Sequence, residues 1–199
     1  VGFLFLLPIL GRATAVALAE GGRSRRVVAG WLWFSAAALP IVALVLVVHA
    51  RTGVATSLIP EEARRKDPTL DTLSWSPLAD VLVEAGIEPR AEGVVLAAPH
   101  WIEGGRVGAA LGDRWPVIVA DGNAHHFPFL HDRRDFVGDD VVFIGTLEGV
   151  ERATERFRDR FERIEELGRV DIERGGSVVT TLAATRGRRL RSPLPPLDR

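Results

Sequence analysis

The chain contains no cysteine, methionine or tyrosine, and its charges of the two signs nearly cancel. The lack of cysteine excludes disulfide bonds, thiolate zinc sites and cysteine nucleophiles, and it leaves the redox compartment open. The 25 Lys+Arg face 26 Asp+Glu, whereas a nucleic-acid-binding protein carries an excess of basic residues. The 199 residues are 47% hydrophobic, which is too apolar for a disordered chain, and their number suits one medium domain or a small domain with an additional segment.

Charge is scarce in the first 50 residues and abundant afterwards. Val27–Ala50 has no formal charge and would form a helix of about 36 Å, long enough to cross a hydrocarbon layer of about 30 Å. Trp31 and Trp33 lie near one end, where indole rings favour the membrane interface. A buried helix of a soluble protein and a cleavable signal peptide are the alternatives. The length of the run argues against both.

The shorter apolar run Val1–Leu10 resembles the end of another transmembrane helix. Because the chain opens inside this run and lacks methionine, we expect a longer protein whose N-terminus lies upstream. Gly11–Arg26, with its four arginines, is then a cytoplasmic loop by the positive-inside rule, and the residues after Ala50 are extracytoplasmic. We assign residues 1–50 to transmembrane segments truncated at the N-terminus, and residues 51–75 to a polar linker.

Residues 76–185 alternate between helical and strand patterns. The expected helices are Ser76–Gly86, Glu103–Leu111 and Leu147–Leu167, and the expected strands are Gly93–Ala98, Pro116–Ala120, Asp140–Ile144, Arg169–Glu173 and Ser177–Thr185. Apolar strands separated by helices favour a parallel sheet with both faces covered. The predicted fold class is therefore α/β: transmembrane helices followed by a small parallel, Rossmann-like soluble domain. The basic, proline-rich residues 186–199 are expected to be a disordered tail.

Ligands of open α/β sheets bind beyond the carboxyl ends of the strands, which here carry Pro99–Trp101, Asp121–Asn123 and Gly145–Thr146. The segment Asp121–Asp132 also holds His125, His126 and His131, which could bind a metal. Their spacing matches no established ligand signature, so a polar surface loop is the default and no metal site is assigned. The glycines of Gly104–Gly108, with Arg106, could cradle an anion or simply allow close packing of a helix.

Three segments of this region resemble the C-terminal part of bacterial family 39 glycosyltransferases, which are protein-mannosyltransferase-like membrane enzymes of the GT-C type. The first contains Asp67-Pro68-Thr69 and Trp75. The second contains Trp101, Gly105-Arg106 and Ala110-Leu111-Gly112. The third contains Phe127 and Phe129. Each motif is weak by itself, and the order and spacing of the three carry the resemblance.

The resemblance implies a membrane enzyme that transfers a sugar from a polyprenyl-phosphate donor to an extracytoplasmic acceptor. The catalytic residues would lie in a loop upstream of this chain, so none is assigned here. Trp101, Arg106, Asp121 and His126 are the candidates for facing a ligand or acceptor. Expected partners are membrane lipid and the lipid-linked donor, with no nucleic acid. No cofactor is expected in this part of the chain, and a divalent cation is left open.

Two alternatives stay open. The first is a membrane-tethered α/β module that binds a ligand or partner without catalysis. It would need neither further apolar spans nor an acidic loop upstream of Val1. The second is a soluble nucleotide-utilising enzyme, against which the uncharged run Val27–Ala50 argues.

Overall fold

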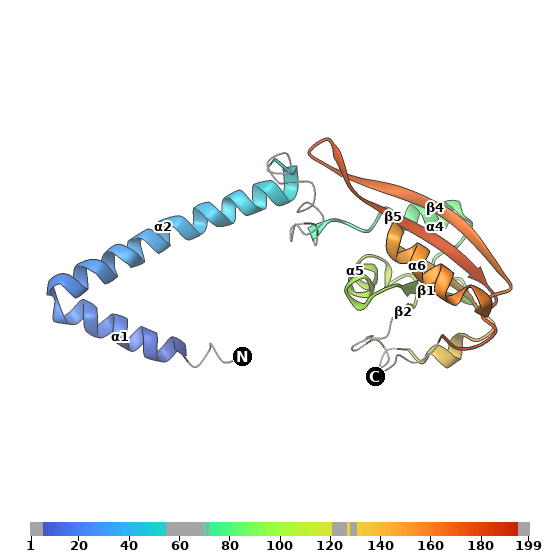
Figure 1. Cartoon of the computed structure of the whole chain (residues 1–199), viewed down its shortest axis with the longest axis horizontal. Coiled ribbons are helices and arrows are strands. Elements are labelled where there is room, and N and C mark those ends of the chain that lie inside the picture. The colour runs from blue at the N-terminus through green and yellow to red at the C-terminus, as the bar shows by residue number, and fades with distance from the viewer. Residues whose placement is uncertain (1–5, 55–69, 71, 121–126, 128–130, 195–199) are drawn as a thin grey trace. The chain divides into compact units, whose positions relative to one another are not determined.

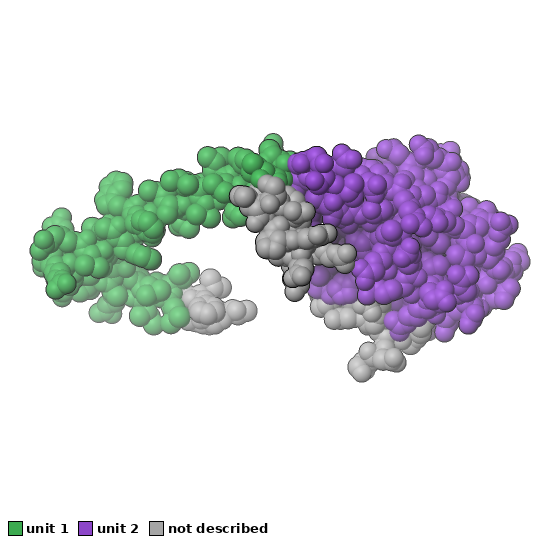
Figure 2. Space-filling model, turned by 45° about the horizontal axis from the view of Figure 1, so that its top comes forward, with its two compact units in different colours: residues 1–58 green, residues 59–199 purple. Residues whose placement is uncertain are grey.

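The computed structural model describes residues 6–54, 70, 72–120, 127 and 131–194. The chain divides into two compact units, Val1–Leu58 and Ile59–Arg199 (Figure 2).

The N-terminal unit contains two helices, α1 (Leu6–Glu20) and α2 (Gly22–Thr52) (Figure 1). The predicted loop Gly11–Arg26 was therefore wrong, because its residues are helical apart from Gly21. The alanine-rich stretch before Glu20 favours a helix, and the chain turns only at Gly21 and Gly22, whose φ angles are +79° and +68°.

Helix α2 contains the whole predicted apolar span Val27–Ala50. Among the described residues it is the one helix long and apolar enough to cross a membrane, and none of its most apolar 18-residue window is buried. Trp31 and Trp33 are 67% and 78% exposed. An exposed apolar surface of this extent is unfavourable in water and is compatible with a lipid environment.

The C-terminal unit is built on one five-stranded sheet in the order β2-β1-β3-β5-β4 (Figure 1). Strands β1 (Val94–Ala98), β2 (Val117–Val119) and β3 (Asp140–Thr146) are parallel. Strands β4 (Arg163–Arg174) and β5 (Ser177–Arg188) form an antiparallel hairpin, and β5 also pairs antiparallel with β3. The α/β class is confirmed, but the prediction of a wholly parallel sheet was wrong.

The hairpin explains this difference. Its two-residue turn is Gly175-Gly176, with φ angles of +62° and +75°, which is the backbone conformation that two-residue hairpins prefer. Such a turn joins neighbouring strands directly, so no helix intervenes between β4 and β5 and the pair is antiparallel.

Helices cover both faces of the sheet. Helix α4 (Leu78–Glu84) and helix α5 (Trp101–Leu111) lie on one face, where Leu82, Val107 and Leu96 belong to the first core. Helix α6 (Leu147–Phe157) lies on the other face and contributes Val150, Ala153 and Phe157 to the second core. In the second core, the ring of Phe143 stacks with that of Phe157 and meets the edge of Phe161.

The predicted helix Leu147–Leu167 was too long. Helix α6 ends at Phe157, a 3₁₀ turn (Arg158–Arg160) follows, and β4 starts at Arg163. Phe161 continues the apolar spacing of α6 but is buried in the second core from the start of the hairpin instead. Consequently Arg163 lies in a strand, where it pairs with Glu165 at 3.1 Å.

Residues 186–194 do not form the disordered tail that was predicted from the sequence. Strand β5 runs to Arg188, and Leu190 and Leu194 are each 1% exposed in the second core. Arg160 holds this segment by donating hydrogen bonds from Nη1 to Ser192 Oγ at 3.0 Å and to the carbonyl oxygen of Pro193 at 2.6 Å. Residues 195–199 lie outside the described residues.

Candidate functional site

The candidate site lies where β1 and β3 end. Strand β1 leads through Pro99 and His100 into α5, and β3 leads directly into α6. Because α5 and α6 cover opposite faces of the sheet, the chain leaves these two neighbouring strands in opposite directions. A crevice at such a point is the usual ligand position of an open α/β sheet.

Glu103 bridges this crevice. Thr146, the last residue of β3, donates a hydrogen bond from Oγ1 to Glu103 Oε1 at 2.7 Å, and its backbone N–H donates to Oε2 at 3.4 Å. Burial raises the pKa of Glu103 above its ordinary value. The hydrogen bonds from Thr146 and the nearby charges of Arg106 and His100 act in the opposite direction. The result is a fixed carboxyl group whose proton is held more tightly than in water.

Two glycines make room for this carboxyl group. A Cβ atom added at Gly145 would lie 2.3 Å from Glu103 Oε2 and 3.0 Å from Pro99 Cδ. At Gly149 an added Cβ would lie 2.9 Å from Thr146 Oγ1 and 3.3 Å from Glu103 Oε2. The ends of β1, β3 and α6 can approach one another this closely only because both positions lack a side chain.

A pocket of about 360 Å³ opens beside Glu103. It is bounded by Pro99 and His100 after β1, by Ala120 after β2, and by one side of α6. The lining residues of α6 are Gly149, Arg152, Ala153, Arg156 and Phe157. Its volume is within the range of small-molecule sites in proteins.

The polar groups of the pocket combine one carboxyl group with basic side chains. Arg152 and Arg156 are four residues apart on α6 and therefore share a face of the helix. Arg152 forms a 3.8 Å ion pair with Glu148 in which both side chains are about three-quarters exposed, and the Arg156 guanidinium carbon lies 5.2 Å from the centroid of the Phe157 ring. His100 Nδ1 accepts the backbone N–H of Ile102 at 3.3 Å and thereby caps α5.

The residues expected from the sequence to face a ligand are only partly described. Trp101 begins α5, with its ring centroid 5.7 Å from that of His100. The guanidinium carbon of Arg106 lies 5.6 Å from the Trp75 ring centroid, and neither Trp101 nor Arg106 lines the pocket. Asp121 and His126 lie outside the described residues, as does His125 of the possible metal cluster. Among the described residues, no group of three or more His, Asp or Glu side chains could hold a metal ion.

Sequence reasoning located the strand ends but missed the side chains that meet there. Pro99, His100 and Thr146 belong to the segments expected at the carboxyl ends of the strands. Glu103, Arg152 and Arg156 were not identified. The available signal was the arginine spacing on α6, the helix that directly follows a strand at the predicted site.

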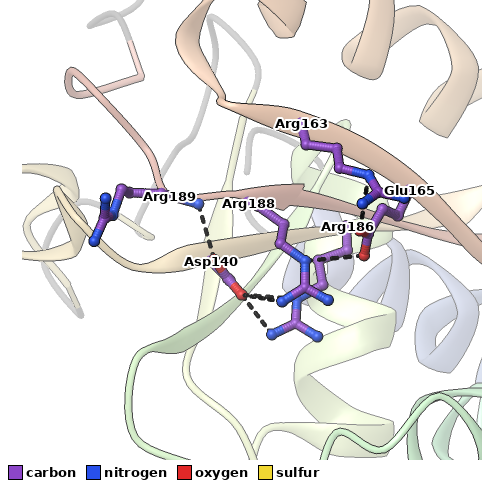
Figure 3. Close-up of polar contacts among 6 residues, drawn as sticks. All are labelled: Asp140, Arg163, Glu165, Arg186, Arg188 and Arg189. Carbon is purple, nitrogen blue, oxygen red and sulfur yellow. Dashed lines mark hydrogen bonds and ion pairs between the residues drawn. The ribbon is translucent and has the colours of Figure 1, made fainter.

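A second charged cluster lies at the opposite end of β3 (Figure 3). Asp140 accepts hydrogen bonds from Arg186 Nε and from the backbone N–H of Arg189, both at 2.8 Å. The Asp140 and Arg186 side chains are 18% and 16% exposed. Glu165 of β4 accepts from Arg188 Nε at 3.0 Å. These contacts connect the start of β3 with the end of the hairpin and suit a structural role.

Comparisons of the chain with protein-family models, with curated proteins and with solved structures find no match.

Proposed function

We propose that the chain is the C-terminal part of an integral-membrane glycosyltransferase similar to family 39, which transfers a sugar from a polyprenyl-phosphate donor to an extracytoplasmic acceptor. In this proposal α2 is a membrane span and the C-terminal unit is an extracytoplasmic domain. The catalytic residues belong to a loop outside these 199 residues.

The observation that carries the proposal is the packing of the three segments that resemble the family. Arg106 of the second segment lies over the ring of Trp75 from the first, 5.6 Å from its centroid. A Cβ added at Gly104 would lie 2.9 Å from the ring of Phe127, which belongs to the third segment. Motifs that are separate in the sequence therefore meet around α5, which supports treating them as one unit.

The chemistry of the proposed reaction agrees with the composition of the chain. A polyprenyl-phosphate donor is confined to a bilayer, so its enzyme needs apolar spans, and α2 meets the requirements of length and composition. Glycosyl transfer also needs a base for the acceptor hydroxyl and cations for the departing phosphate. We assign the base to the upstream loop.

The test compares two proteins in proteoliposomes. One is the complete gene product, and the other is this 199-residue chain alone. Each receives radiolabelled polyprenyl-phosphate sugars, with membranes from cells lacking the gene as the source of acceptor. We expect transfer by the complete product and none by the chain alone. Failure of the complete product with every donor, or transfer by the chain alone, would contradict the proposal.

The second candidate is a membrane-tethered module that binds a ligand without catalysis. The pocket beside Glu103 favours it, because a preformed cavity with convergent polar groups is typical of ligand binding. The sequence upstream of Val1 discriminates the candidates. A transferase of this type needs several further apolar spans with an acidic loop between the first two, whereas a tethered module needs neither.

A further inference from the structure

The pocket of about 360 Å³ beside Glu103 is lined by two arginines, Arg152 and Arg156, and by a carboxyl group that can accept hydrogen bonds. We propose that it binds a phosphate ester that carries sugar hydroxyls, with the phosphate held by Arg152 and Arg156 and a hydroxyl held by Glu103. The binding would occur in the α/β unit itself. It therefore goes beyond the proposed sugar transfer and does not depend on it.

The phosphate side of the pocket is formed by α6. The i,i+4 spacing of Arg152 and Arg156 lets two guanidinium groups reach one anion, and the planar fork of each group matches two phosphate oxygens. The ion pair of Arg152 with Glu148 is long and exposed, so little energy is lost when a ligand replaces it. Among the described residues, Arg156 forms no ion pair with a carboxylate and contacts the ring of Phe157 instead.

The hydroxyl side is formed by Glu103. A carboxylate offers about four acceptor positions, of which the hydroxyl and the backbone N–H of Thr146 use two. Because the carboxyl group packs closely against the backbone at Gly145 and Gly149, its orientation is fixed before a ligand arrives. A fixed acceptor favours a ligand with a hydroxyl group over a bare inorganic anion.

Apolar groups complete the wall of the pocket. Pro99, Ala153 and Phe157 line the same pocket as the carboxyl group of Glu103 and the two arginines. The C–H face of a sugar ring can pack against such carbon atoms while its hydroxyls point to polar groups. The same chemistry occurs in a soluble sugar phosphate and in the headgroup of a glycosylated or inositol-containing phospholipid, so the test includes both sources.

Isothermal titration calorimetry on the full chain in phosphatidylcholine nanodiscs tests the proposal, with glucose 1-phosphate as the probe. We expect Arg152→Ala and Arg156→Ala each to weaken binding about tenfold, and Glu103→Gln to weaken it about fivefold. The control is Arg158→Ala, which removes a 59%-exposed arginine outside the pocket and should leave affinity unchanged. Circular dichroism confirms that each variant is folded.

Three further titrations determine which part of the ligand is recognised and where the ligand comes from. Glucose should not bind, and inorganic phosphate should bind at least tenfold more weakly than glucose 1-phosphate. Nanodiscs containing phosphatidylinositol distinguish the source: competition with the probe indicates a lipid headgroup, and its absence indicates a soluble ligand. The proposal is overturned if glucose 1-phosphate does not bind, if the Arg152→Ala/Arg156→Ala double variant binds it normally, or if inorganic phosphate binds equally well. These readouts measure binding alone, so their failure is distinguishable from a failure of sugar transfer.

Discussion

Thr146 Oγ1 donates a 2.7 Å hydrogen bond to Glu103 Oε1 and so connects the end of β3 to the first turn of α5. The two residues are 43 positions apart in the chain. The helices that follow β1 and β3, α5 and α6, cover opposite faces of the sheet. Thr146 is also the residue before α6 and makes no side-chain hydrogen bond to the helix it precedes. Its hydroxyl is used instead to hold the carboxyl group at the pocket.

We predict that Gly145→Ala destabilises the α/β unit through Glu103. The added Cβ would lie 2.3 Å from Glu103 Oε2, so the carboxyl group must move, at a cost of about 1–3 kcal/mol in the free energy of unfolding. Urea denaturation of the single and double variants measures the effect. In a Glu103→Ala background the same substitution should cost less by about 0.5 kcal/mol or more, because the two residues are in contact.

The matched control is Gly105→Ala, in the same helix as Glu103. An added Cβ there meets nothing within 4 Å, and alanine favours a helix more than glycine does. This substitution should leave stability unchanged or raise it by roughly 0.5–1 kcal/mol. Equal destabilisation by both glycine substitutions, or no energetic coupling between positions 145 and 103, would refute the arrangement described for the crevice.

A second prediction concerns pH. Burial raises the pKa of Glu103 above its ordinary value of 4.5, so the folded state binds the proton more tightly than the unfolded state does. This contribution to stability is present in full below pH 4.5 and is lost as the pH rises through the raised pKa. The charges of Arg106 and His100 oppose the effect of burial and make the rise in the pKa of Glu103 smaller. The pKa is still raised, so the predicted direction of the pH dependence is unchanged.

Glu103→Gln removes this titration while keeping a hydrogen-bond acceptor for Thr146. The difference in unfolding free energy between the natural chain and the variant should therefore change as the pH rises above 4.5, in the direction that favours the natural chain at lower pH. Urea titrations from pH 4 to 7 measure it, and groups common to both proteins cancel in the difference. A difference that is constant across this range would contradict the assignment.

A third prediction sets the boundaries of the independently folding unit. Residues 76–184 omit Trp75, which is 3% exposed, and cut β5 before its pairing with β3 and β4 is complete. They also omit the buried Leu190 and Leu194. We expect residues 73–194 to unfold cooperatively and residues 76–184 to be less stable by several kcal/mol, as measured by thermal denaturation. Equal stability of the two fragments would show that the C-terminal segment is dispensable.

The parallel half of the sheet could be predicted from the sequence because its strands are continuous apolar runs buried on both faces. Val95 and Leu96 are adjacent in β1, fully buried, and packed in opposite cores. Such runs are typical of central parallel strands. The helices α4 and α5 were also predicted near their observed positions. Pro77 and Gly86 mark the two ends of α4, and Gly112 follows the last residue of α5.

The hairpin was harder to predict because a β-bulge interrupts the alternation of β4. The register shifts between Glu166 and Gly168, so Ile164 packs against the second core while Val170 and Ile172 pack against the first. An extra residue in a strand reverses which side chains point inward. Only the residues after the bulge, near Arg169–Glu173, show the regular pattern of a strand.

The candidate site was predicted in position but not in composition. The rule that ligands lie at the carboxyl ends of parallel strands indicated the end of the sheet where the pocket beside Glu103 lies. The bond between Glu103 and Thr146 depends on how α5 and α6 lie on the two faces of the sheet, which periodicity in one helix does not specify. Arg106 illustrates the difficulty: its position on α5 was expected, but its guanidinium group lies over Trp75.

A fourth prediction tests the segments that resemble family 39. In the complete protein, Arg106→Ala and Trp101→Ala should each lower the rate of sugar transfer more than His131→Ala does. Arg106 contacts Trp75 across two of these segments, whereas the ring centroid of His131 lies 5.9 Å from that of Phe136, which belongs to none of them. The measurement is initial transfer rate per folded protein molecule, with protein amounts matched by immunoblotting. Equal losses in all three variants would argue against a special role of the second segment.

The most direct measurement is the labelling of single cysteines in intact cells that express these 199 residues, because this sequence contains no cysteine of its own. The variants are Ser24→Cys in the first turn of α2 and Ser177→Cys at the exposed first residue of β5, and the reagent is a membrane-impermeant maleimide. The account predicts labelling of Ser177→Cys in intact cells and of Ser24→Cys only after the membrane is permeabilised. If both variants react only after permeabilisation and the protein is recovered in the soluble fraction, α2 does not span a membrane and the account is contradicted.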